Sequence, residues 1–356
     1  MKCDKISRMK KIGLTLIILS LLLSGCSLFG PKKIEHFKLV LTPQEVPGDL
    51  LKASVDFKAQ LKTKMLKKGY DLLNLEVIVT TMNQEAAPQV INQEADMAFL
   101  PLINFVDVKD EGANYFLSTT HPELDLGNTD LSLYNSIQDN TEPLVEVPYR
   151  YAAIYTGPSE YGKKLQAMSD GGQTITWIDI NQAKWCHVVV SSLDGYIYPS
   201  LWMIDTLERR MGELFDHTLA IKGYVDVISL LADESCDVAA GPVTLRQTYQ
   251  SIWTTALENE GFGRTQSIYD EVKVIGITQK IYDDVFVLRT PQATEEEWMD
   301  EDFILALKES FLELANTPET SVKLFDLLGF SGLTEIDPLE YDSAIPALEY
   351  IQRIMN

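Results

Sequence analysis

The sequence predicts an α/β fold of two lobes, each a mainly parallel sheet with flanking helices, and a ligand cleft between the lobes. Strands alternate with helices twice, over about 37–100 and 186–240, which is typical of parallel sheets covered by helices. The chain has 356 residues, of which 46% are hydrophobic, so it can bury a large core and is long enough for two domains. Strands near 149–156 and 285–289 are candidates for the crossovers that join the lobes.

The first set of elements has the order β-α-β-α-β. Asp49 is a good N-cap, and the apolar residues after it recur near helical spacing until Gly69, a common helix stop. The predicted elements are a strand at 37–42, a helix at 49–68, a strand at 75–81, a helix at 84–92 and a strand at 96–100.

The second set follows a less regular region at 116–148. Its predicted elements are strands at 186–190, 218–221 and 236–240, helices at about 195–211 and 225–232, further strands at 272–277 and 285–289, and helices at 294–315 and 317–328. The predicted division of the chain is a signal peptide at 1–25, a lipidated cysteine and tether at 26–36, lobe 1 at 37–156, lobe 2 at 157–278, and a return to lobe 1 with C-terminal helices at 279–356.

The N-terminus resembles a bacterial lipoprotein signal. Basic residues precede Ile12–Leu23, an apolar run too short to span a bilayer but typical of a secretory signal. The run ends in Leu23-Ser24-Gly25-Cys26, which resembles the lipobox whose cysteine is diacylated. Since two acyl chains anchor a protein stably, we expect an extracytoplasmic protein tethered to the cell membrane through Cys26. An ordinary signal peptide or a membrane anchor is the alternative.

Charge and missing motifs narrow the function classes. The net charge of −22 argues against a nucleic-acid partner. The sequence has no Gly-x-Ser-x-Gly elbow, no P-loop and no His-Glu-x-x-His, and its four histidines are scattered without ligand spacing. We therefore predict neither a catalytic centre nor a bound metal or cofactor. An extracytoplasmic enzyme on an α/β fold, or a surface lipoprotein without a transport role, remains an alternative class.

The stretch VVVSSLDGYIYPSLW, Val188–Trp202, is the strongest candidate for a ligand site. A β-branched strand ends in Ser191 and Ser192, and a helix begins near Asp194 and Gly195. Helix N-termini carry unpaired N–H groups with partial positive charge, small residues let a ligand approach them, and serine hydroxyls add donors. Asp194 is either a plain N-cap or a carboxylate that faces the ligand or tunes a phosphate site. Tyr196, next to the turn, is a candidate ligand contact.

Several stretches carry a resemblance to a known family. They are Ala95–Pro101 (ADMAFLP), Val188–Pro199, Gly223–Ala240 and Lys273–Arg289. Together with the lipobox, their order and spacing resemble the substrate-binding lipoproteins of bacterial ABC importers, in the phosphate/phosphite/phosphonate-binding group with the type II periplasmic-binding-protein fold. The likeness covers most of residues 37–330.

The resemblance implies a receptor that closes its two lobes on a small polar ligand and delivers it unchanged to a membrane permease with its ATPase. We expect a monomer whose ligand contains phosphate or phosphonate. The site residues implied are Ser192, Gly195 and Asp237; Phe99 and Gln44 are added because they lie at strand ends of the first lobe. The family topology also places Cys186 and Cys236 before neighbouring strands, within range of a disulfide; two buried thiols are the alternative.

The sequence departs from the family at Asp194, because the family often has Ser-Thr-Ser-Gly where this chain has Ser192-Leu193-Asp194-Gly195. A carboxylate there competes with an anionic ligand for the same donors, at a cost of about 4 kcal/mol at intermediate dielectric. Two other ligand classes therefore stay open: a phosphorylated vitamin such as thiamine pyrophosphate, and a cationic or zwitterionic solute.

Overall fold

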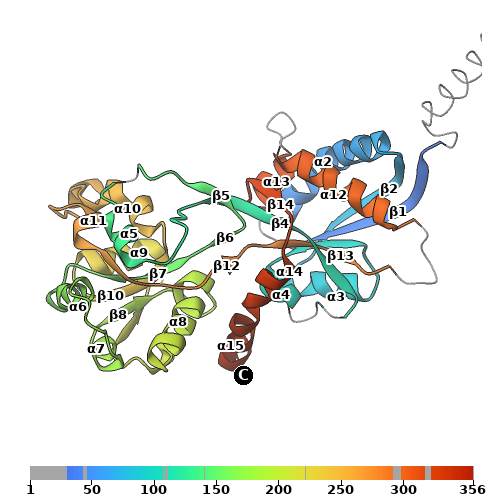
Figure 1. Ribbon diagram of the computed structural model, residues 1–356. Helices are drawn as coiled ribbons and strands as arrows, with labels where there is room; N and C mark the ends of the chain where they lie inside the picture. The colour runs from blue at the N-terminus through green and yellow to red at the C-terminus, as the bar shows by residue number, and fades with distance from the viewer. Residues whose placement is uncertain are drawn as a thin grey trace, which may run out of the picture.

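The chain forms two α/β lobes joined by a narrow waist of strands (Figure 1). This computed structural model describes residues 30–42, 46–106, 109, 111–139, 141–220, 222–291, 298–316 and 322–355. Each lobe has its own mixed sheet flanked by helices, so the predicted two-lobed α/β fold is confirmed. Within the described residues, none of the helices is both long and apolar enough to cross a membrane.

The first-lobe sheet has the order β14-β4-β13-β3-β1-β2. Its strands are β1 (Lys32–Leu41), β2 (Tyr70–Val79), β3 (Met97–Leu100), β4 (Ala113–Glu123), β13 (Val285–Arg289) and β14 (Gly332–Thr334), and β5 (Val145–Val147) pairs with β4. β1 is parallel to β2 and β3, whereas β13 runs antiparallel to β3 and β4. The helices around it are α2 (Pro47–Lys67), η1 (Asn83–Glu85), α3 (Ala86–Ile91), α4 (Leu102–Val106), α12 (Glu301–Asn316) and α13 (Lys323–Leu327).

The second-lobe sheet has the order β11-β7-β10-β8-β9. Its strands are β7 (Ala152–Thr156), β8 (Trp185–His187), β9 (His217–Leu219), β10 (Val238–Pro242) and β11 (Lys273–Ile277). β8 is parallel to β9 and β10, and β7 is antiparallel to β10 and β11. The helices are α5 (Leu131–Ser136), α6 (Glu160–Asp170), α7 (Trp177–Asn181), η2 (Leu193–Ile197), α8 (Tyr198–Leu207), η3 (Met211–Glu213), α9 (Tyr224–Ala232), α10 (Leu245–Trp253), η4 (Leu257–Asn259) and α11 (Ile268–Glu271).

Two short strands form the waist. β6 (Tyr149–Arg150) pairs antiparallel with β12 (Ile281–Tyr282), so two of the segments that pass between the lobes lie side by side. The chain also crosses before and after α5, which follows β4 of the first sheet, packs against β11 of the second, and precedes β5. The last residues form α14 (Pro338–Tyr341), η6 (Asp342–Ala344) and α15 (Ile345–Met355). α15 lies below the waist between α4 and α8 and contacts both (Figure 1).

Helical periodicity explains the first-lobe core. Leu50, Phe57, Leu61 and Met65 recur on one face of α2 and are fully buried. The Phe57 ring packs against Phe311 of α12, with ring centroids 5.6 Å apart. This face therefore joins α2 to α12 over the sheet.

Several element boundaries differ from the prediction. β1 begins at Lys32, inside the predicted tether, because residues 32–36 pair in parallel with β2. The region 116–148 contains most of the long strand β4, which its prolines obscured. The predicted strand 149–156 is two strands, of which β7 lies in the second sheet although lobe 1 was drawn to 156. The predicted helix starts at Thr294 and at 317 lie outside the described residues.

Candidate ligand-binding site

The segment after β8 has the geometry that the sequence suggested, with a different capping residue. Ser192 is the N-cap: its Oγ accepts a hydrogen bond from the Gly195 N–H at 3.1 Å. Asp194 is therefore not the cap. The first turn, η2, is a π-helix that continues into α8, a rare conformation found often at functional sites. A Cβ at Gly195 would lie 2.2 Å from Val188 Cγ2, so only glycine fits this turn.

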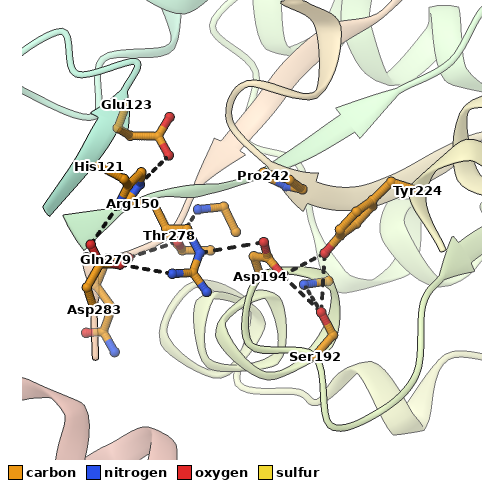
Figure 2. Close-up of polar contacts among 12 residues, drawn as sticks. His121, Glu123, Arg150, Ser192, Asp194, Tyr224, Pro242, Thr278, Gln279 and Asp283 are labelled. Carbon is orange, nitrogen blue, oxygen red and sulfur yellow. Dashed lines mark hydrogen bonds and ion pairs between the residues drawn. The ribbon is translucent and has the colours of Figure 1, made fainter. Parts of the chain in front are cut away.

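Hydrogen-bond donors converge on the Asp194 carboxylate (Figure 2). Asp194 Oδ1 accepts from the Tyr224 hydroxyl at 2.7 Å and from Ser192 Oγ at 3.0 Å. Burial, and then the charge of Asp194, raise the pKa of Tyr224 above its usual range, so its hydroxyl stays a donor at neutral pH. The hydroxyl oxygens of Ser192 and Tyr224 are themselves 3.2 Å apart. We call Ser192, Tyr224 and Arg150 the donor set.

Arg150 contributes the positive charge from the waist. Its Nε lies 3.7 Å from Asp194 Oδ2 on the second-lobe side, and its Nη1 donates to Asp283 Oδ1 at 3.2 Å on the other side (Figure 2). Burial by itself lowers the pKa of Arg150, but the carboxylates of Asp194 and Asp283 outweigh it and leave the pKa raised. Arg150 is therefore a permanent cation between two carboxylates.

A pocket of about 350 Å³ opens on the first-lobe side of Arg150. We call it the hinge pocket; it is lined by Thr119, Thr120, His121, Arg150, Asp283, Asp284, Leu328, Gly329 and Phe330. Burial, and then the charge of Asp283, raise the pKa of Asp284 to about 6. Among the residues that the structure describes, no group of three or more His, Cys, Asp or Glu side chains is placed to hold a metal ion.

His121 links the pocket to a buried carboxylate. Its Nδ1 lies 2.6 Å from Asp283 Oδ2, and its Nε2 lies 3.4 Å from Glu123 Oε2. Burial lowers the pKa of His121, but the hydrogen bonds to Asp283 and Glu123 outweigh it and raise the pKa to about 9. His121 is therefore a cation at neutral pH. The charges alternate from Glu123 through His121, Asp283 and Arg150 to Asp194 (Figure 2).

This raised pKa predicts a pH-dependent stability. In the unfolded chain the pKa of His121 is about 6.5, so the folded state binds the proton more tightly and the stabilisation is complete below that pH. It is lost as pH rises through about 9. The full shift corresponds to about 3 kcal/mol, and solvent screening of the partly exposed imidazole reduces it, so we expect the free energy of unfolding to fall by about 2 kcal/mol between pH 6.5 and 9.5. Denaturant titrations across this range measure it.

The matched variants separate this effect from general titration. His121→Gln should flatten the pH profile, whereas His36→Gln, at an exposed position on β1, should leave it as in the wild type. An identical slope in the wild type and His121→Gln would contradict the assignment.

The predicted site residues divide into two groups. Ser192, Asp194 and Gly195 lie together, and Ser191 is exposed at the turn before them. Tyr196 is buried in the second-lobe core, where its ring packs on His187 with centroids 5.1 Å apart. Burial and a hydrogen bond with the Tyr350 hydroxyl raise the pKa of Tyr196. The structure thus places Tyr196 in a packing role.

Phe99 and Asp237 lie away from the donor set. Phe99 is fully buried and packs on Phe286 and Phe330. Asp237 precedes β10 at the edge where that strand begins, whereas the donor set lies near Pro242, where β10 ends (Figure 2). Its carboxylate accepts from Ser159 Oγ and the Lys184 N–H, a local structural role. Gln44 and Cys26 lie outside the described residues.

The cysteines are free and buried. Cys186 is the middle residue of β8, and Cys236 lies two residues before β10. The structure holds them as two thiols and not as a disulfide. Burial, and then a hydrogen bond with Cys236, raise the pKa of the Cys186 thiol. The alternative of two buried thiols is the one that the structure adopts.

The sequence reasoning missed four residues of the site: His121, Arg150, Tyr224 and Asp283. Arg150 had a visible signal, because it is the one cation in an otherwise apolar and aromatic strand segment at a predicted crossover. Asp283 likewise stands between two predicted strands. Tyr224 and His121 had no such signal, since only tertiary structure brings them to the waist.

A two-lobed α/β protein with donors and a pocket at its waist belongs to the class of bilobal solute-binding proteins. The sequence profile of one family within this class matches residues 39–341: "ABC transporter, phosphonate, periplasmic substrate-binding protein". The chain belongs to this family. It is thus an extracytoplasmic substrate-binding protein of an ABC transporter, a class that captures small phosphorus-containing ligands and does not convert them.

One solved structure supports the fold, and two others are matched at lower structural similarity. The chain is similar to Mh-p37 of Mycoplasma hyorhinis, with 11% identity, coverage of 91% of this chain and all of that one, and a TM-score of 0.54. It also matches XAC2383 from Xanthomonas citri bound to ATP (12% identity, 90% and 98% coverage, TM-score 0.49). A third match is PhnD1 from Prochlorococcus marinus in complex with methylphosphonate, with 12% identity, coverage of 91% of this chain and 100% of that one, and a TM-score of 0.43. A comparison with curated proteins finds no match.

Proposed function

We propose that this chain binds a phosphonate or phosphate group with the donor set at its waist and delivers the ligand to its permease. Convergence of the donors on one carboxylate carries the proposal. Ser192, Tyr224 and Arg150 come from three separate segments, yet all face the two oxygens of Asp194. A carboxylate and a phosphonate both present anionic oxygens, so this is a place where an anionic oxygen is stabilised.

Closure about the waist is the proposed mechanism. The strands β6 and β12 are short and paired, so they can serve as the hinge. The hinge pocket lies on the first-lobe side of Arg150, and Ser192 and Tyr224 lie on the second-lobe side. A ligand held at Arg150 therefore contacts both lobes and favours the closed form, which a permease can distinguish from the open form.

We further propose that the mature protein is a monomer anchored by lipid at Cys26. The lipobox resemblance at Leu23–Cys26 supports the anchor. We also propose that the boundary between lobe 1 and lobe 2 lies at the β6–β12 ribbon, near residue 150 and not at 156.

A second candidate ligand is a cationic or zwitterionic solute. It is favoured by the carboxylates of Asp194, Asp283 and Asp284 around a single arginine. Thiamine pyrophosphate carries both kinds of charge, and Mh-p37 is described as a proposed thiamine pyrophosphate transporter. The anion proposal is preferred because hydroxyl donors and Arg150 already stabilise anionic oxygen at this place.

Titration calorimetry of the mature protein tests these ligands. Methylphosphonate and inorganic phosphate should bind, and spermidine should not; thiamine pyrophosphate carries both kinds of charge, so its binding is compared with theirs and does not decide between the two candidates. Ser192→Ala or Tyr224→Phe should weaken anion binding about tenfold or more, because a hydrogen bond to a charged group contributes about 1.5–3 kcal/mol.

The controls remove the same groups elsewhere on the second lobe. Ser251→Ala and Tyr249→Phe, both on α10, should leave the affinity unchanged. Binding of spermidine alone would replace the anion proposal with the cationic one.

A further inference from the structure

Asp194 occupies the donors that the proposed ligand needs. Its Oδ1 accepts hydrogen bonds from the hydroxyls of Tyr224 and Ser192, at 2.7 and 3.0 Å. Its Oδ2 lies 3.7 Å from Nε of Arg150. The Asp194 side chain is only 16% exposed, so solvent competes weakly for these contacts. The carboxylate thus sits where an anionic ligand would be bound.

Local structure does not account for this carboxylate. The helix start is already capped by Ser192, whose Oγ accepts from the Gly195 N–H. Tyr224 lies at the start of α9 and Arg150 lies in the waist, so neither belongs to the helix that carries Asp194. Two of the three contacts of Asp194, with Tyr224 and Arg150, therefore connect separate segments, and only the one from Ser192 lies within its own turn.

We propose that Asp194 is a specificity-determining residue, an internal counter-ion that holds the donor set until the ligand arrives. This inference rests on the proposed function. An arriving anion must displace the carboxylate or lie beside it, and the repulsion grows with the ligand's own negative charge. Asp194 therefore lowers the affinity for all phosphorus anions and discriminates against dianions more strongly than against monoanions.

The charges around the site reinforce this selection. Arg150 also donates a hydrogen bond from its Nη1 to Asp283. While Asp194 remains in place, the charge of Arg150 is therefore not fully available to a dianion. His121, the other cation, faces Asp283 and Glu123 and not the donor set. A monoanion matches the one guanidinium, whereas a dianion leaves an excess of negative charge.

Substitution of Asp194 by Asn tests the inference, because the amide oxygen can still accept from Ser192 and Tyr224 while the charge is gone. The probes are inorganic phosphate and dimethyl phosphate at about pH 8, a dianion and a monoanion respectively. By titration calorimetry, Asp194→Asn should bind phosphate at least tenfold more tightly than the wild type. The gain for dimethyl phosphate should be smaller.

Matched variants make the outcome decisive. Asp205→Asn removes the same charge from an exposed position on α8, and should leave both affinities unchanged. Asp194→Ser removes the charge with a smaller side chain and replaces Asp194→Asn in the test if the asparagine variant does not fold. It should show the same order of gains, larger for phosphate than for dimethyl phosphate.

The outcomes separate this inference from the proposed function. If the wild type binds phosphate, Ser192→Ala weakens it, and both Asp194 variants bind no more tightly, the internal counter-ion is wrong and the anion site stands. Binding of spermidine that disappears in Asp194→Asn, with no gain for phosphate, also overturns it. If neither the wild type nor the variants bind any phosphorus anion, the proposed function fails and this inference with it.

Discussion

Replacement of Arg150 by methionine is expected to lower the free energy of unfolding by about 3 kcal/mol. Its guanidinium is the shared cation of Asp194 and Asp283, whose side chains are 16% and 8% exposed. Removing one partner of a buried ion pair leaves an uncompensated charge, and here it leaves two. Hydroxyl donors to Asp194 and the His121 cation beside Asp283 offset part of the loss, which keeps the estimate at the low end of the known range.

Denaturant titration measures this change, and a double variant tests its cause. Arg150→Met combined with Asp194→Asn should cost less than the sum of the single substitutions, because the second removes a charge that the first left unpaired. Arg209→Met breaks an exposed pair with Glu213 and should change stability by less than about 0.5 kcal/mol. Additive costs in the double variant would argue that Arg150 acts through packing.

The Arg150→Met substitution should also weaken anion binding. A charged hydrogen bond contributes about 1.5–3 kcal/mol, so phosphate affinity should fall about tenfold to a hundredfold. A stable Arg150→Met protein with unchanged affinity would remove the arginine from the proposed donor set.

Truncation of Tyr350 to alanine is the second large effect that we expect, about 3 kcal/mol in the free energy of unfolding. Along α15, Ala347, Tyr350 and Ile351 face the second-lobe core, and Ile345 and Leu348 face the first-lobe core. This spacing of three and four residues places two apolar stripes side by side on one helix. α15 is therefore a further link between the lobes, in addition to the segments of the chain that cross between them.

Loss of Tyr350 should release the second-lobe side of this link. Tyr350 is 3% exposed and hydrogen-bonds to Tyr196, which lies in η2 next to the donor set. We expect a larger radius of gyration for the ligand-free protein in solution scattering, together with the lower stability. Glu349→Ala, at an exposed position on the same helix, is the control and should change neither quantity. A destabilised Tyr350→Ala protein with unchanged dimensions would show that α15 stabilises without spacing the lobes.

Sequence pattern predicted the elements of both parallel cores well, because hydrophobic periodicity reports which face of a local segment is buried. It failed for β4, whose pairing with β13 and β14 is set by residues more than 160 positions away. The assignment of Asp237 to the ligand rested on the family resemblance, and the structure places this residue at the other end of β10 from the donor set. Ligands collect where parallel strands end, and Asp237 stands where β10 begins.

The sequence by itself determined the two-lobed α/β class, the family likeness, and the turn at Ser192–Gly195 with its unusual carboxylate. These are local properties: helix and strand periods, the start of a helix and a glycine in its first turn are all readable from neighbouring residues. Only the tertiary structure decided that Asp194 meets Tyr224 and Arg150, that Tyr196 and Phe99 are core residues, and that Cys186 and Cys236 remain thiols. The reason is that a charge acts through space, so the partner of a carboxylate depends on how the lobes and their hinge fold together and not on its place along the chain.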